Sequence, residues 1–160
     1  MPDYFPLVKG RVLEYRSRTP DGERAVTTQV LSVADSDGRR VAECQRTTLA
    51  AGEPPTTRRF TVVADGAGVV CGGDLEFPVP ASAGRTWKRY PREYSIESLE
   101  GEVATPSGAY RGCLVVVYSI AGGDAGFGRR YYAPGVGFVY ESCADEADPY
   151  ELALARIAGP

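Results

Sequence analysis

The segment Cys113-Leu114-Val115-Val116-Val117-Tyr118 is an uninterrupted apolar run with three β-branched residues at its centre. A short apolar run of this kind, bounded by turn residues, is typical of a β-strand that is covered on both faces. Other segments, such as Ala25 to Ala34, alternate in character, as expected for a sheet with one face on the core and one face in water. The chain is therefore predicted to be built from β-strands.

Strand-like segments recur along the rest of the chain. They are Arg11 to Arg18, Ala25 to Ala34, Arg39 to Leu49, Thr57 to Ala64, Val69 to Cys71, Thr86 to Tyr90, Tyr94 to Thr105, Cys113 to Ile120, Gly128 to Ala133, Phe138 to Cys143 and Glu151 to Ile157. Hairpin signals separate them at Asp21-Gly22, Asp37-Gly38, Asp65-Gly66, Gly72-Gly73, Pro106-Ser107-Gly108 and Gly122-Gly123-Asp124. The last segment, around Tyr150 to Ile157, is compatible with a strand or a short helix, and we favour a strand.

The connections are too short for crossover helices, so neighbouring strands should pair antiparallel. The expected fold class is all-β: an antiparallel meander of about ten or eleven short strands, curled into an open or half barrel or a sandwich.

The sequence also contains an internal repeat. Phe5-Pro6-Leu7 and Gly10-Arg11-Val12-Leu13 recur as Phe77-Pro78-Val79 and Gly84-Arg85-Thr86-Trp87, and Ala64 to Val70 recurs as Ala133 to Val139. Both matches lie about seventy residues apart, and two ordered matches at one offset indicate duplication. Half a chain of this size would bury too small a hydrophobic core to fold stably alone. We therefore expect one domain over residues 1–160, with similar halves at about 5–72 and 77–143 and a C-terminal strand at about 150–157.

Composition and charge bear on whether the protein binds nucleic acid or enters a membrane. A formal net charge of -3 disfavours nucleic acid as a partner. No stretch approaches the roughly 20 apolar residues of a membrane-spanning helix, and no basic and apolar leader opens the chain, so we expect no membrane insertion. The expected location is cytoplasmic for the chain as written, or the cell envelope or exterior if a leader has been removed.

Catalytic and metal-binding residue types are sparse. The chain has no histidine, which excludes His-dependent nucleophilic triads and His-ligated metals, and its four cysteines form no C-x-x-C pair. The acidic residues Asp145, Glu146, Asp148 and Glu151 lack the spacing of a calcium loop and are interpreted as a solvated loop. We expect no metal, no cofactor and no catalytic residue, with a carboxylate pair at Glu100 and Glu102 as the enzymatic alternative.

Aromatic residues in the predicted strands, together with arginines, form a candidate ligand-binding site. If the sheet curls, inward aromatic side chains and rim arginines would enclose a small apolar or amphipathic ligand with an acidic head group. The candidate ligand-binding residues are Tyr15, Trp87, Tyr118, Tyr132, Arg59 and Arg130. The competing interpretation is that the aromatic residues simply fill the core and the arginines lie in solvent.

Three stretches resemble a group of uncharacterised bacterial all-β proteins, many of them predicted lipoproteins or secreted proteins. The stretches are Tyr4-Phe5-Pro6-Leu7 with Gly10 and Tyr15, Pro106 to Leu114, and Tyr131 to Val139. The resemblance implies an antiparallel meander that curls like an open or half barrel, and it implies no activity. Unlike many of those proteins, the chain has no lipobox cysteine near its start.

The function expected from the sequence is therefore a non-enzymatic binding or interaction module. Its partner would be a small apolar or amphipathic ligand, or a protein or peptide that pairs with a free sheet edge. The alternative is a hydrolase or lyase-type enzyme that uses carboxylates.

Overall fold

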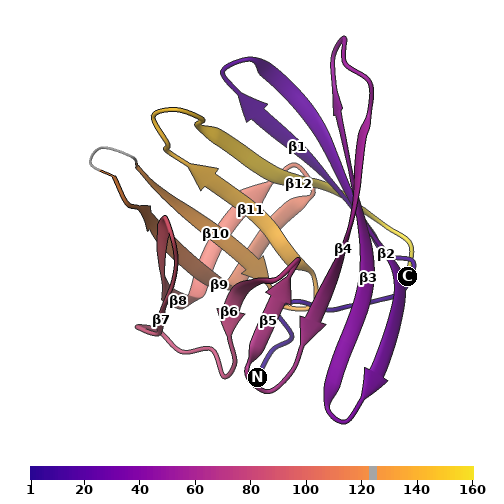
Figure 1. Ribbon diagram of the computed structural model, residues 1–160, viewed down its shortest axis with the longest axis vertical. Helices are drawn as coiled ribbons and strands as arrows, with labels where there is room; N and C mark the ends of the chain where they lie inside the picture. Colours follow the sequence, from indigo (N-terminus) through magenta and orange to yellow (C-terminus); the bar gives the residue numbers. More distant parts are fainter. Residues whose placement is uncertain (123–125) are drawn as a thin grey trace.

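The computed structural model describes residues 1–122 and 126–160, and these residues form one sheet of twelve antiparallel strands (Figure 1). The strands are β1 (Val12–Thr19), β2 (Gly22–Ser36), β3 (Arg39–Ala50), β4 (Thr56–Ala64), β5 (Gly68–Cys71), β6 (Asp74–Pro78), β7 (Thr86–Arg89), β8 (Arg92–Thr105), β9 (Gly108–Ile120), β10 (Phe127–Ala133), β11 (Gly137–Cys143) and β12 (Tyr150–Ala158). The all-β antiparallel prediction is confirmed, and the last segment is a strand.

The structure has one strand more than the largest predicted number. The missed strand is β6, because its proline made the end of the segment look like part of a linker, and proline is disfavoured inside a sheet. Pro78 is the last residue of this strand, and β6 is an edge strand, where proline is tolerated. The hairpin signal at Gly122-Gly123-Asp124 lies partly outside the described residues.

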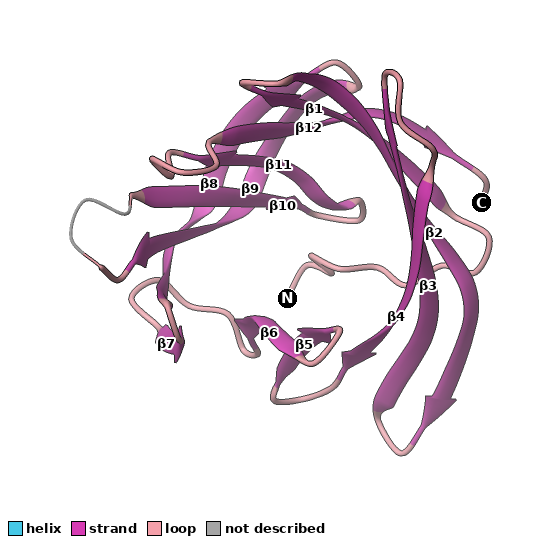
Figure 2. Ribbon diagram, turned by 45° about the horizontal axis from the view of Figure 1, so that its top comes forward, coloured by secondary structure: helices cyan, strands magenta, loops and turns pink. Residues whose placement is uncertain are grey.

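The strand order places the two chain ends in the middle of the sheet. It runs β6-β5-β4-β3-β2-β1-β12-β11-β10-β9-β8-β7, so β1 pairs with β12 and each half of the chain extends to one side. The sheet curls until its two edges, β6 and β7, approach each other, and it forms a nearly closed barrel with an unsealed seam (Figure 2). The predicted curled meander is confirmed.

Side chains, not a backbone ladder, join the two edges at the seam. The indole Nε1 of Trp87 on β7 donates to the carbonyl oxygen of Leu75 on β6 at 3.1 Å. Arg89 forms an ion pair with Asp74 across the same gap. Since the sheet is not continuous here, the seam is held by a few specific contacts.

The N-terminal segment lies within the curve of the sheet (Figure 2). Tyr4 and Leu7 are buried, and the ring of Phe5 lies 6.5 Å from that of Phe77 and 6.2 Å from that of Tyr132. The apolar residues before the first strand therefore supply part of the core that the sheet encloses.

A matching backbone arrangement follows each Phe-Pro segment. Gly10 donates to the carbonyl of Val30 and Val30 donates to that of Arg11, while Gly84 and Arg85 make the same exchange with Ile96. Both glycines have φ near +85°, at +84° and +87°, a conformation that side chains disfavour. Glycine is required at both positions because the chain turns there before it joins the sheet.

Strand β9 is covered on both faces, as its apolar run predicts. Cys113, Leu114, Val115 and Val116 are all no more than 2% exposed. This strand forms a rigid wall of the interior and carries Tyr118 into it.

Candidate functional site

A network of polar side chains lies inside the curled sheet. Arg130 on β10 donates from Nε to Oε1 of Glu141 on β11 at 2.9 Å, and its Nη1 lies 3.5 Å from Oε2 of Glu76 on β6. The Tyr132 hydroxyl donates to Glu76 at 2.6 Å, and the Tyr118 hydroxyl donates to Glu141 at 2.7 Å. We call these five residues the interior network; they join four strands, including the seam strand β6.

The charges of this network are largely removed from water. The side chains of Arg130, Glu141 and Glu76 are 15%, 7% and 19% exposed. A buried charge is tolerated only when it is paired and hydrogen-bonded, and here one guanidinium serves two carboxylates. Removal of any one of its charged members would therefore leave a buried charge without compensation and lower the stability of the fold.

The same surroundings fix the protonation of the network. Burial alone would lower the pKa of Arg130, but the neighbouring Tyr132, Glu141 and Glu76 outweigh it and the pKa is raised. Burial, followed by the nearby carboxylates Glu76 and Glu141, raises the pKa of Tyr132 and Tyr118 above the usual value of a phenol. Both tyrosines therefore remain protonated donors at neutral pH.

Aromatic rings cover the guanidinium of the network. The guanidinium carbon of Arg130 lies 5.3 Å from the ring centre of Tyr118 and 5.8 Å from that of Tyr94. Tyr94 in turn stacks on Trp87, with ring centres 5.3 Å apart and planes within 4°. Cation–π contacts of this kind add stabilisation where the cation is desolvated.

A cavity of about 170 Å³ lies beside the interior network. Its lining residues are Phe5, Pro6, Leu7, Arg11, Leu13, Tyr15, Thr28, Val30, Cys44, Arg46, Phe60, Val62, Cys71, Glu76, Arg130, Val136, Gly137, Phe138, Glu141 and Leu152. Most are apolar, while Glu76, Glu141 and Arg130 present the network at one part of the wall. Arg46 lines the cavity and is exposed, so the cavity reaches solvent beside Arg46.

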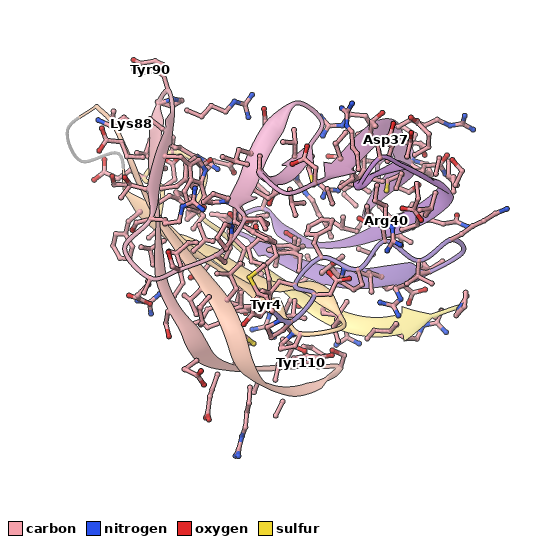
Figure 3. All side chains as sticks on the ribbon, turned by 90° about the horizontal axis from the view of Figure 1, so that it is seen from below. Tyr4, Asp37, Arg40, Lys88, Tyr90 and Tyr110 are labelled. Atoms are coloured by element: carbon pink, nitrogen blue, oxygen red, sulfur yellow. The ribbon has the colours of Figure 1, made fainter. Side chains whose placement is uncertain are left out.

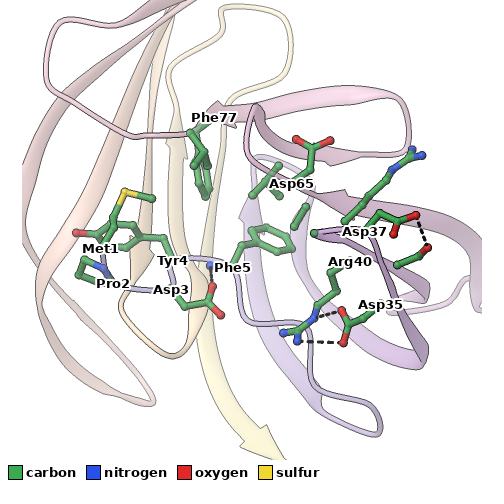
Figure 4. A pocket seen from close by; sticks show the side chains of 16 residues that line it. Met1, Pro2, Asp3, Tyr4, Phe5, Asp35, Asp37, Arg40, Asp65 and Phe77 are labelled. Carbon is green, nitrogen blue, oxygen red and sulfur yellow. Dashed lines mark hydrogen bonds and ion pairs between the residues drawn. The ribbon is translucent and has the colours of Figure 1, made fainter.

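Larger hollows lie elsewhere and are lined by many exposed residues. One, of about 590 Å³, lies between the N-terminal residues and the β2–β3 turn, where Arg40 pairs with Asp35 at 2.7 Å (Figure 4). Another, of about 220 Å³, lies beside Arg24 and Thr56, and a third, of about 470 Å³, lies beside Trp87, Lys88 and Tyr118. Figure 3 shows Lys88 and Tyr90 on the hairpin that extends from this end of the molecule. Among these four hollows of the described residues, the 170 Å³ cavity is the one that combines apolar walls with the charged members of the interior network.

The structure separates the six sequence-predicted site residues into four groups. Tyr15 and Arg130 line the cavity, and Tyr118 and Tyr132 belong to the interior network. Trp87 lies at the seam. Arg59 is exposed and adjoins the cavity-lining Phe60 on its strand, so alternation puts it on the outer face.

Sequence reasoning missed Glu76, Glu141 and Arg46. Glu141 had a signal, because a carboxylate two residues after the apolar Val139 interrupts a buried strand. Glu76 lies between Leu75 and Phe77 in the strand that was not predicted. Glu141 is the direct cross-strand partner of Arg130 in the β10–β11 hairpin, whereas the contact of Glu76 with Arg130 depends on the curl of the sheet and has no local signature.

The other candidate reactive groups are not activated. Burial raises the pKa of the Cys44 thiol to about 11 and that of Cys113 to about 11, so both are protonated at neutral pH. Glu100 and Glu102 are exposed, and Glu102 lies 3.7 Å from Arg111. All four cysteines are free thiols.

The described part of the chain contains neither a group of side chains suited to hold a metal ion nor a membrane-spanning helix. Across residues 1–122 and 126–160, His, Cys, Asp and Glu side chains form no group of three or more that could hold a metal ion. The same residues contain no helix with the length and apolar character needed to cross a bilayer.

Comparison with known proteins finds the same fold in two bacterial proteins. A predicted exported protein with a YmcC-like fold from Bacteroides fragilis superposes with a TM-score of 0.73 at 17% identity, over 99% of this chain and 100% of the other. A predicted lipoprotein from Parabacteroides distasonis superposes with a TM-score of 0.66 at 14% identity, over 98% and 99%. No protein-family model matches the sequence, and neither does any curated protein. The chain therefore shares the fold of these exported proteins and lipoproteins.

Proposed function

We propose that this protein is a non-enzymatic binding protein that holds a small amphipathic ligand inside its curled sheet. The observation that supports the proposal is the cavity of about 170 Å³, which combines apolar walls with the charged interior network. Binding sites for small molecules are usually concave, mostly apolar and provided with a few fixed polar groups.

The size of the cavity limits the ligand. Sites for drug-sized molecules have volumes of roughly 300–1,000 Å³. An apolar cavity of about 150 Å³ can hold a molecule the size of benzene. A cavity of about 170 Å³ therefore suits a short apolar body and excludes a long lipid chain.

The polar groups of the cavity favour binding over catalysis. Glu76 and Glu141 each accept a hydrogen bond from a tyrosine and face Arg130, so their charges are already compensated. The adjoining Cys44 thiol is protonated, because burial raises its pKa to about 11. These groups can orient a ligand, but none is poised as a nucleophile or a base.

A location in the cell envelope is part of the proposal. The two similar proteins are described as an exported protein and a lipoprotein, which supports the envelope alternative over the cytoplasmic one. A ligand carrier or sensor of small molecules would meet its ligand there.

We further infer that the halves 5–72 and 77–143 arose by duplication within one domain. The matching exchanges of Gly10 and Gly84 with the following strand, and the mirrored strand order around the β1–β12 pair, support this inference. The two Gly-x-Gly turns differ, since Gly135 and Gly137 have positive φ while Gly66 and Gly68 do not. The halves have therefore diverged in turn geometry.

The binding proposal is tested with 1-hexanol as a neutral amphipathic probe. Titration followed by methyl NMR is expected to shift resonances of cavity residues such as Leu13, Val30 and Val62, but not that of the exposed Leu49. Val62→Phe fills the cavity and should abolish these shifts while thermal unfolding shows that the variant remains folded. Absence of saturable shifts in the wild type would refute the proposal.

A further inference from the structure

Arg46, which lines the cavity, lies directly across from a second arginine on the neighbouring strand. Arg46 on β3 pairs directly with Arg58 on β4, so both side chains leave the same face of the sheet. Among the residues that the structure describes, neither forms an ion pair. Like charges directly opposite in a sheet are unfavourable. An anion bound between them would relieve the repulsion.

A hydroxyl group lies in the same cross-strand row. Thr28 on β2 pairs with Arg46 and, like Arg46, lines the cavity. Its Oγ1 is buried and has no hydrogen-bond partner in the described part of the chain. A buried polar atom without a partner is costly, so a ligand oxygen at this point would satisfy it.

The charges of the cavity give the ligand an orientation. Glu76 and Glu141 also line the cavity, and an acidic group close to them would be repelled. Beside Arg46 the wall is apolar, and the guanidinium carbon lies 5.5 Å from the ring centre of Phe60. An acid would therefore place its carboxylate at the mouth and its hydrocarbon against Phe60 and Val62.

We propose that Arg46, Arg58 and the Thr28 hydroxyl form a carboxylate-binding site, and that the ligand is a short monocarboxylic acid with an apolar body. This inference rests on the proposed binding function and assigns the chemical class of the ligand. The two guanidinium groups bind the carboxylate by charge-assisted hydrogen bonds, which are stronger than hydrogen bonds between neutral groups. The cavity volume limits the apolar body to a short chain or a single ring.

The test compares hexanoate, 1-hexanol and hexylammonium as probes of equal chain length, by calorimetry or NMR titration of the wild type at low salt. Hexanoate is expected to bind at least about tenfold more tightly than 1-hexanol, and hexylammonium more weakly than both. Arg46→Gln and Arg58→Gln should each reduce the hexanoate affinity by about tenfold and the 1-hexanol affinity by clearly less, because the alcohol carries no charge. Thr28→Val should weaken hexanoate by a few fold.

Arg59→Gln is the matched control, because Arg59 is the next residue along the same strand and is exposed on its other face. It should leave hexanoate binding unchanged. Equal affinities of hexanoate and 1-hexanol, or equal losses from Arg58→Gln and Arg59→Gln, would overturn the carboxylate site while the binding function stands. Failure of every probe to bind the wild type would instead overturn the binding function itself.

Discussion

Replacement of Arg130 by methionine is the sharpest test of the interior network. Methionine keeps most of the side-chain volume and removes the single cation that serves both Glu76 and Glu141. Two carboxylates then remain in the interior with only their tyrosine donors. The variant measures what the network contributes, because the packing around the side chain changes little.

The expected cost is set by burial. Removing one partner of a buried ion pair typically costs about 3–5 kcal/mol, because the other charge is left without compensation. The exposures of 15% for Arg130 and 7% for Glu141 put this pair in that class. For a chain of this size, the cost corresponds to a fall in Tm of about 6–20 °C.

Urea unfolding, followed by circular dichroism and by the fluorescence of the only tryptophan, measures this cost. The midpoint should fall without a change in m, since the surface exposed on unfolding is the same. The matched control is Arg129→Met, one residue away on the same strand. Arg129 pairs with Glu97 at 2.7 Å, but both side chains are about 45% exposed, so this change should cost less than about 1 kcal/mol.

Adding Glu141→Gln to Arg130→Met should recover part of the lost stability, because it removes one of the two uncompensated charges. Equal, small losses for Arg130→Met and Arg129→Met would show that the interior pair is solvated and would refute the argument.

Three further predictions concern the seam, the wall and the thiols. Trp87→Phe keeps the ring stack but loses the hydrogen bond to Leu75, so it should cost about 0.5–1.5 kcal/mol in urea unfolding and speed amide exchange in β6 and β7. Gly128→Ala places a methyl group against the ring of the buried Tyr118 and should cost about 1–3 kcal/mol. The pKa of Cys44 is raised to about 11, so its alkylation should be slow at pH 7 and accelerate as the pH rises toward that value.

Each of these predictions has a control. Tyr90→Phe alters an aromatic residue that is 91% exposed and should not change stability. Gly66→Ala should be neutral, since no atom lies within 4 Å of the added carbon. Unfolded protein should react rapidly at Cys44. A native protein labelled there as fast as the unfolded one, or a Gly128→Ala variant as stable as Gly66→Ala, would contradict the packing described above.

Local pattern was sufficient to predict the strands and their antiparallel pairing. The apolar run Cys113 to Tyr118 predicts a strand covered on both faces, and the burial of β9 confirms it. Short connections rich in glycine permit hairpins and exclude crossover helices, so the meander follows from sequence alone. The same patterns could not predict β6, because a short edge strand that ends in proline has no distinct signature.

The candidate site was predictable in composition but not in arrangement. The sequence by itself determined that the predicted strands contain tyrosines and arginines that could bind a ligand, and that histidine-dependent catalysis is excluded. It also singled out Arg130, Tyr118 and Tyr132. The register of one hairpin pairs Arg130 with Glu141, but only the tertiary structure decided that Glu76 joins them, and that Arg58 rather than Arg59 shares a face with Arg46. Alternation along a strand is local, but its phase relative to the core depends on pairing register and on the curl of the sheet, which joins residues far apart in the chain.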